Sequence, residues 1–236
     1  MIIAINKISV WQILVLMLSL LGLASQASGD SHEDMTKAIH LKPNMYNGLV
    51  IFRICSKCHY EEGWGQRSGI FPQLAGQHAK VIVKQLVDVR DHKRETVGMD
   101  HFAMLKEIGE PQVLADVAGY ISSILMTPNP GLGAGTDLVH GKSLFSEYCA
   151  ACHGSNGEGN NDLFYPRIQG QHYEYLLRQF KWIYRKERTN VQPGMVSAIS
   201  NFTQRDTEAV IDYISRLKPP KEKLAPSVKW KNPDFE

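Results

Sequence analysis

Apolar residues recur at helical spacing through most of the chain, and no stretch alternates apolar and polar residues as a half-buried strand would. Short helices are predicted at about 47–54 and 141–148. Two longer helices follow residues 78 and 172. Their apolar positions are Val81, Val83, Leu86 and Val87 in the first and Tyr175, Leu176, Phe180 and Ile183 in the second. This pattern predicts an all-α protein.

Two further helices have recognisable starts. Pro111 suits the first turn of a helix, where a missing N–H costs nothing, and it precedes an apolar stripe that includes Val117 and Ile121. Thr203 and Asp206 form the pattern of a capping box before the last apolar helix. Each half of the chain is therefore expected to end in a buried helix.

The first 27 residues differ from the rest. Lys7 precedes an apolar run over 8–24, and Ser25-Gln26-Ala27 follows it. A basic start, an apolar centre and a small-x-small site are typical of a secretory signal, so cleavage is predicted after Ala27. The alternative is an uncleaved membrane anchor, for which the run is at the short end. Under both interpretations the bulk of the chain is exported.

The candidate chemistry is concentrated in two motifs, Cys55-Ser-Lys-Cys58-His59 and Cys149-Ala-Ala-Cys152-His153, which contain all 4 cysteines of the chain. In a C-x-x-C-H motif the two thiols add to the vinyl groups of haem, and the histidine becomes an axial ligand of the iron. The motifs therefore predict two covalently bound haem c groups. The thioethers would be Cys55, Cys58, Cys149 and Cys152, and the proximal iron ligands would be His59 and His153.

Other uses of the cysteines fit less well. A redox dithiol expects a strand–helix setting, and neither motif follows a strand-like run. A four-cysteine zinc site is the main remaining alternative, but it gives no reason for a histidine directly after each pair of cysteines.

The two motifs belong to a longer repeat. The motifs are 94 positions apart (149 minus 55), and the same shift relates Pro72 to Pro166 and Gly76-Gln77-His78 to Gly170-Gln171-His172. Near the ends the shift drifts to 93. Two long copies indicate a duplicated domain rather than a solenoid. The predicted organisation is a signal peptide at 1–27, a first haem domain at 28–126, a linker at 127–140, a second haem domain at 141–217 and an extended tail at 218–236.

Charge narrows the range of partners. The formal net charge is +2, and it falls to +1 when the predicted signal is removed with its single lysine. So small a charge gives no support for nucleic-acid binding. The segment 178–188 is locally basic and is interpreted either as a surface that steers an acidic partner or as a solvated helix face.

The second axial ligand decides between a carrier and a catalyst. A methionine fills the last coordination position of the iron and raises the reduction potential of the haem, whereas an open position permits catalysis. In the second repeat the candidate is Met195, in a predicted loop between two helices. In the first repeat Met99 is preferred, because Gly98-Met99 repeats Gly194-Met195, and Met104 and then His101 are the alternatives.

These residues resemble the cytochrome c4 family of exported di-haem cytochromes. The resemblance covers roughly residues 45–217. It rests on both C-x-x-C-H motifs and, more specifically, on Phe71-Pro-Gln-Leu-Ala-Gly-Gln-His78 with Tyr165-Pro-Arg-Ile-Gln-Gly-Gln-His172. The departures are Tyr60, where the family usually has glycine, the irregular loop around Met99 and the long tail.

The resemblance implies two class I cytochrome c domains, each helical around one haem, with the haems meeting at the domain interface through their propionates. It also implies that the carbonyl groups of Pro72 and Pro166 accept hydrogen bonds from His59 and His153, which would fix each ring.

The resulting prediction is a periplasmic electron-transfer protein, soluble or membrane-associated, that passes single electrons through two His/Met haems. Expected partners are redox proteins, among them a quinol-oxidising complex and a terminal haem–copper oxidase or another periplasmic reductase. A haem-based sensor or an oxidase subunit would differ mainly in its partners.

The alternative is a di-haem oxidoreductase, of the peroxidase or sulfur-compound dehydrogenase type, with one open or displaceable ligand. A thiosulfate-oxidising enzyme of this kind uses an additional cysteine, and the chain has none left. For a peroxidase, Asp100 and His101 are the local candidates, and they do not form a recognisable acid–base motif.

Overall fold

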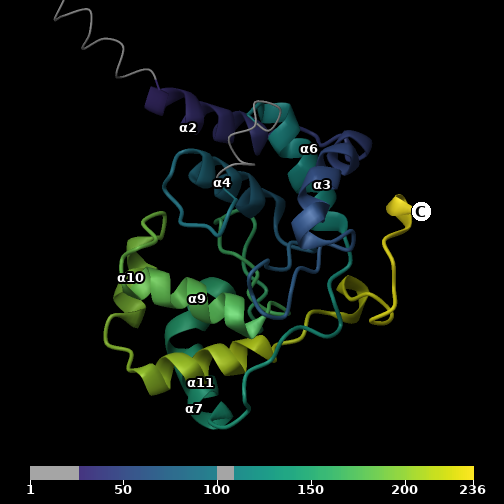
Figure 1. Ribbon diagram of the computed structural model, residues 1–236. Helices are drawn as coiled ribbons and strands as arrows, with labels where there is room; N and C mark the ends of the chain where they lie inside the picture. The colour runs from purple at the N-terminus through teal and green to yellow at the C-terminus, as the bar shows by residue number, and fades with distance from the viewer. Residues whose placement is uncertain (1–26, 100–108) are drawn as a thin grey trace, which may run out of the picture.

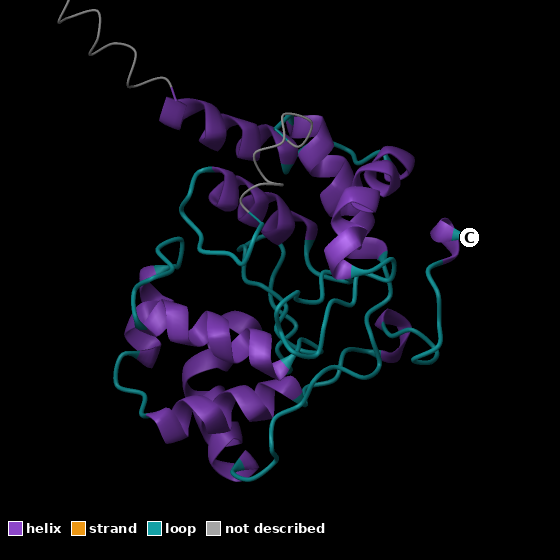
Figure 2. Ribbon diagram, viewed as in Figure 1, coloured by secondary structure: helices purple, strands orange, loops and turns teal. Residues whose placement is uncertain are grey.

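The computed structural model describes residues 27–99 and 109–236. Within them every named element is helical, and the β pairing is limited to isolated bridges, Met126 with Leu224 and Asn160 with Tyr165. Figure 1 shows one group of helices above another, and Figure 2 shows the loops that run between the two groups. The all-α prediction is confirmed over the described residues.

Both groups are built around the helix that carries a C-x-x-C-H motif. The first group consists of α2 (Ala27–Ala38), α3 (Met45–His59), α4 (Ala79–Arg90) and α6 (Pro111–Ser123). The second consists of α7 (Leu138–Leu144), the π-helical turn η2 (Phe145–Cys149), α8 (Ala150–His153), α9 (Tyr173–Tyr184), α10 (Pro193–Ile199) and α11 (Gln204–Ser215). The tail adds the 3-10 turns η3 (Lys221–Lys223) and η4 (Pro233–Phe235). In the described ranges no helix is long and apolar enough to cross a bilayer.

The helix boundaries differ from the predicted ones where a motif follows. α3 continues through the first motif and ends at His59, and α7 begins at Leu138, inside the predicted linker. The predicted starts of the later helices are confirmed. Pro111 lies in the first turn of α6, and Thr203 and Asp206 form a capping box on α11. The hydrogen bonds from Thr203 lower the pKa of Asp206 to about 2, so its carboxylate caps the helix in ionised form.

In each group the helix that carries or leads into the motif crosses the last helix at a glycine. A Cβ at Gly48 would lie 2.2 Å from the carbonyl oxygen of Asp116, and a Cβ at Gly141 would lie 2.1 Å from that of Ala209. The missing side chain lets the backbone of α3 lie directly on α6, and that of α7 directly on α11. These two crossings set the angle at which each motif enters the interior.

The π-helical turn η2 explains why the repeat shift changes from 93 to 94 just before the motifs. Gly48 and Gly141 are 93 positions apart (141 minus 48), and so are the buried residues Phe52 and Phe145 (145 minus 52). The first cysteines of the motifs are 94 apart (149 minus 55). A π-helical turn accommodates one extra residue, and η2 places it between Phe145 and Cys149. Both motifs therefore keep the same position relative to the helix crossing.

The two Gly-Gln-His segments exchange equivalent hydrogen bonds between the groups. Nε2–H of His172 donates to the carbonyl oxygen of Trp64 at 2.7 Å, and Nε2–H of His78 donates to that of Glu158 at 2.8 Å. The repeat shift relates both donors (172 minus 78 is 94) and both acceptors (158 minus 64 is 94). The repeats therefore bind one another as the subunits of a twofold dimer do.

The glutamines of the same segments complete this contact. The Gln77 amide donates to the carbonyl oxygen of Arg167 and accepts from its N–H, both at 2.9 Å. Gln171 donates to the carbonyl oxygen of Gln73 at 2.8 Å and accepts from its N–H at 3.0 Å. Gln73 and Gln171 are buried, and a buried amide with satisfied partners fixes the orientation of the groups that it joins.

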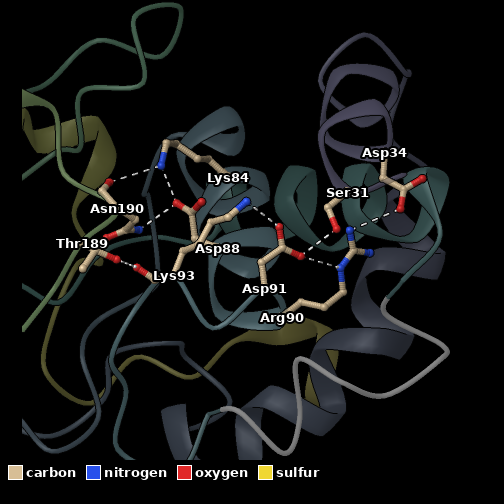
Figure 3. Close-up of polar contacts among 9 residues, drawn as sticks. All are labelled: Ser31, Asp34, Lys84, Asp88, Arg90, Asp91, Lys93, Thr189 and Asn190. Carbon is tan, nitrogen blue, oxygen red and sulfur yellow. Dashed lines mark hydrogen bonds and ion pairs between the residues drawn. The ribbon is translucent and has the colours of Figure 1, made fainter. Parts of the chain in front are cut away.

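A polar cluster on α4 provides a second link between the groups (Figure 3). The buried carboxylate of Asp88 accepts hydrogen bonds from Lys84 and, at 2.7 Å, from Asn190. Beside it the Thr189 hydroxyl donates to the carbonyl oxygen of Lys93 at 3.1 Å. The cluster ties the end of α4 to the loop that follows α9.

We expect Gly141→Ala to destabilise the protein by about 2–4 kcal/mol, because the new methyl group would overlap the backbone of α11. Lys142→Ala, at the exposed neighbouring position, should change the free energy of unfolding by less than about 0.5 kcal/mol. Denaturant unfolding measures both values. Equal stability of the two variants would contradict the close crossing of α7 and α11.

Candidate functional site

A cavity of about 450 Å³ is lined by both groups of helices and reaches both C-x-x-C-H motifs. Its walls are mainly apolar, and they include side chains from α3, α4, α6, α9 and α11. The cavity brings together all the predicted site residues that the structure describes. These are Cys55, Cys58, His59, Pro72, Met99, Cys149, Cys152, His153, Pro166 and Met195.

Helix α3 delivers the first motif to the cavity. Cys55 and Cys58 are one helical turn apart, so both thiols leave the helix on the same side. His59 is 2% exposed, and its Nδ1–H donates to the carbonyl oxygen of Pro72 at 2.8 Å. This bond fixes the tautomer and leaves Nε2 as the nitrogen that can bind a metal.

The second motif repeats this geometry. Nδ1–H of His153 donates to the carbonyl oxygen of Pro166 at 3.0 Å. Burial lowers the pKa of both His59 and His153, and the bond to the proline carbonyl opposes part of that effect. Both imidazoles are therefore neutral near neutral pH, which is the form that binds iron.

The first thiol of each motif is in apolar surroundings that do not activate it. Burial raises the pKa of Cys55 to about 11 and that of Cys149 to about 12. A redox dithiol or a zinc site requires thiolates, which this environment disfavours. In the described part of the chain, no three His, Cys, Asp or Glu side chains are placed to share a metal ion. The geometry therefore favours thioether formation over the zinc alternative.

Met195 lies in a helix, and the prediction of a loop at this point is wrong. Pro193 occupies the first turn of α10 and Met195 follows it within the same turn. A proline at this position favours a helical start, because its fixed φ suits the first turn. Met195 packs against the second hydrophobic core and lines the cavity, so a short helix rather than a loop presents it.

The first repeat presents Met99 to the same cavity. Met99 is half-buried and lines the cavity wall. It follows Gly98, whose φ of 76° lies in the left-handed region that glycine adopts readily. Met104 and His101, the two alternatives, lie outside the described residues, and so does Asp100. Met99 as the axial ligand stays a prediction.

Four arginines of the described residues also line this cavity, and three of them, Arg94, Arg178 and Arg188, come from α9 and the loops after α4 and α9. Arg94 is 8% exposed, and its Nη2 donates to the Tyr175 hydroxyl at 2.6 Å. Its Nη1 and the Nε of Arg178 are buried without a hydrogen-bond partner among the described residues. Buried guanidinium N–H groups in this state favour an anionic ligand with oxygen acceptors.

Arg94 and Arg188 are equivalent in the repeat (188 minus 94 is 94). Burial, assisted by the charge of Arg94, lowers the pKa of Arg188 to about 9. Nearby Asp88 balances this cluster only in part, because it also pairs with Lys84. The sequence analysis did not predict Arg94 or Arg188 as site residues. Their separation equals the repeat shift, and this could have indicated a shared role.

The predicted basic surface at 178–188 is therefore narrower than the sequence indicates. Lys181, Arg185 and Lys186 are exposed, whereas Arg178 and Arg188 reach the cavity. Arg178 donates to the carbonyl oxygen of Ile70 at 3.2 Å, and its guanidinium lies 5.3 Å from the centre of the Trp182 ring. One segment thus provides both an exposed cationic face and half-buried cations at the cavity wall.

Comparison with known proteins decides the family. A family model described as Cytochrome c matches residues 138–218. Cytochrome c4 of Azotobacter vinelandii is 31% identical over 221 residues, which cover 86% of this chain and 96% of that protein. The crystal structure of reduced recombinant cytochrome c4 from Pseudomonas stutzeri aligns with a TM-score of 0.64 and 25% identity, over 75% of this chain and 100% of that one. The chain belongs to the cytochrome c4 family.

This membership makes the protein a di-haem c-type cytochrome that transfers electrons. The enzymatic alternative has weaker support. A thiosulfate dehydrogenase from Marichromatium purpuratum aligns with a TM-score of 0.62 at 22% identity, and the match covers 44% of that chain. That likeness shows the fold alone.

The residues of the cavity fit two haem c groups. The first motif offers two thiols on one side of α3, and the second offers Cys149 at the end of η2 and Cys152 in α8; each motif also has one neutral imidazole with Nε2 available. The arginines offer N–H groups to haem carboxylates, which are planar acceptors that guanidinium groups bind well. When bound, haem supplies a metal centre that gains and loses one electron. The protein excludes water, orients the imidazoles and supplies positive charge.

We expect Arg94→Gln to lower the reduction potential of at least one haem, because a nearby positive charge favours the state with the extra electron. A loss of about 1 kcal/mol corresponds to about 40 mV for a one-electron couple. Arg94→Lys should retain most of the potential, and Arg185→Gln, at an exposed cation, should change it little. Potentiometric titration measures all three variants. Unchanged potentials in Arg94→Gln would contradict a role for this charge.

Proposed function

We propose that the protein carries single electrons between respiratory proteins on the outer side of the cytoplasmic membrane. The observation that most supports this is the cavity shared by both motifs. Two haems bound there would contact side chains of the same apolar wall, so an electron that enters at one haem can leave from the other without crossing solvent. The shared wall also excludes water from both metal centres.

In this proposal each iron has two protein ligands. The first haem is attached to Cys55 and Cys58 and ligated by His59 and Met99. The second is attached to Cys149 and Cys152 and ligated by His153 and Met195. Such closed irons offer no position for a substrate, and a methionine ligand raises the reduction potential into a range suited to electron carriage.

The proposed organisation has haem domains at 28–126 and 141–217, joined by residues 127–140 and followed by the tail at 218–236. Residues 1–27 would direct export to the periplasm, and 1–26 of them lie outside the described residues. A quinol-oxidising complex is the proposed donor. A terminal haem–copper oxidase or another periplasmic reductase is the proposed acceptor.

The methionine ligands are tested with carbon monoxide, which binds only an open ferrous iron. We expect no binding by the wild-type protein and about one equivalent per chain in Met195→Ala or Met99→Ala, because each substitution opens one iron. Met45→Ala, at an exposed methionine, should bind none. Optical titration of the reduced protein gives the stoichiometry.

The same titration distinguishes the alternatives for the first haem. If Met104→Ala opens one iron and Met99→Ala does not, the ligand is Met104. Carbon monoxide binding by the wild-type protein would overturn the closed-iron proposal altogether.

The proposed docking surface is the cationic face formed by Lys181, Arg185 and Lys186 on and after α9. The opposite side of the same helix lines the cavity through Leu176 and Phe180. A partner bound at the cationic face would therefore be separated from the second haem by a single helix. Transient redox partners use small contact areas and depend on charge for orientation.

We expect the triple change of Lys181, Arg185 and Lys186 to glutamate to slow oxidation by respiratory membranes several-fold at low salt, because it reverses the steering charge. The difference should shrink as ionic strength rises. A triple change of Lys221, Lys223 and Lys229 to glutamate alters the net charge equally at an exposed site on the tail. Equal slowing of both variants would show that net charge, and not this face, controls the rate.

A further inference from the structure

The turn that follows His59 has a conformation suited to glycine. Tyr60 has φ of 65° and ψ of 163°, a region that residues with a Cβ adopt only under strain. The equivalent residue in the second repeat is Gly154, with φ of 81° and ψ of 161°. The first histidine is therefore followed by a strained residue, and the second is not.

The C-terminal tail reaches this strained turn. The tail leaves the second domain after α11 and ends beside α3 of the first (Figure 1). Asn232 is 4% exposed, and its Nδ2 donates to the carbonyl oxygen of Glu61 and to the Tyr120 hydroxyl, both at 2.9 Å. This hydrogen bond from a buried side-chain amide to the residue after Tyr60 restrains the backbone at the point of strain.

Two neighbouring tail residues hold the rest of the turn. Trp230 stacks on Trp64, with ring centroids 5.8 Å apart, and Lys231 pairs with Glu62 at 2.8 Å. Trp64 is also the residue whose carbonyl oxygen accepts the hydrogen bond from His172. The tail thus contacts the turn that begins after His59 and continues to the domain interface.

The second repeat has a different arrangement. The counterpart of Glu61 is Ser155 (155 minus 61 is 94), and the segment after α11 meets this turn one residue later, where Nδ2 of Asn156 donates to the carbonyl oxygen of Lys218 at 2.9 Å. The tail therefore covers the turn at which the first repeat has a non-glycine residue.

We propose that Asn232 and Trp230 are positioning residues for the first haem. They clamp residues 60–64, hold Tyr60 in its strained conformation and so keep His59 oriented toward the iron. The second haem needs no such clamp because Gly154 adopts the same turn without strain. The inference rests on the proposed role of His59 as ligand, which the haem content of His59→Ala tests separately.

Hydrogen exchange of the holoprotein locates the effect. The Gly63 and Gly65 amides donate to the carbonyl oxygens of Tyr60 and His59 at 2.9 and 3.0 Å. We expect Asn232→Ala to accelerate exchange in peptides that contain these amides roughly tenfold, because a buried hydrogen bond is lost. Val228→Ala, at an exposed tail position, should leave them unchanged.

The second repeat supplies an internal control. The equivalent amides of Gly157 and Gly159 donate to Gly154 and His153 at 3.2 and 2.7 Å. Their exchange should not change in Asn232→Ala. Equal acceleration in both repeats would mean general destabilisation and would overturn the proposal, as would no acceleration relative to Val228→Ala.

The decisive experiment asks whether glycine at position 60 removes the effect of Asn232→Ala. In a Tyr60→Gly background, Asn232→Ala should accelerate exchange by less than threefold, because the turn no longer needs restraint. Potentiometric titration should show one shifted potential in Asn232→Ala and its recovery in the double variant. If Tyr60→Gly leaves the tenfold effect intact, the tail does not act through strain at Tyr60. If both potentials stay at their wild-type values in Asn232→Ala, it does not position the haem ligand.

Discussion

The hydrogen bonds from His172 to Trp64 and from His78 to Glu158 hold the two repeats face to face, and the shared cavity depends on them. Loss of either bond would leave an imidazole N–H, buried at His172 and half-buried at His78, and a carbonyl oxygen unpaired, which makes the contact specific. His172 also accepts a hydrogen bond from the Gly131 N–H at 2.9 Å through Nδ1. Burial lowers its pKa, so near neutral pH the neutral ring keeps one donor and one acceptor for these two partners.

The domain contact is symmetric, but the two haem sites are not identical. The second repeat accommodates an extra residue in the π-helical turn η2, before Cys149. The first has Tyr60 at a turn where its counterpart is Gly154, and the tail covers that turn. Duplication therefore preserved the helix crossings and the histidine geometry, while the surroundings of each haem changed separately.

Electrostatics link the cavity to its cofactors. Arg94, Arg178 and Arg188 bring positive charge to a largely buried place, and Asp88 offsets only part of it. Buried cations without sufficient counter-charge destabilise a fold. Haem carboxylates would supply that counter-charge, so cofactor attachment and the stability of the domain contact are expected to reinforce one another. Exposed Lys181, Arg185 and Lys186 remain available to a partner.

Several features could be predicted because they depend on residues close together in the chain. The two C-x-x-C-H motifs place thiols and imidazole on one helix, and apolar spacing predicts the main helices. The starts of two of these helices were also predictable, since Pro111 and the Thr203–Asp206 pair act within a single turn. The repeat could also be recognised in the sequence, and it led to the resemblance to the cytochrome c4 family.

Features that depend on contacts distant in the chain could be seen only in the folded protein. Motif spacing is local, so the sequence is enough to show which side chains are available for cofactor chemistry. It did not determine that Met195 lies in a helix or that Arg94 and Arg188 face the cavity. Nor did it show that Asn232 binds the turn beside Tyr60. Each of these depends on which surfaces are buried together, and only packing of the two repeats and the tail sets that.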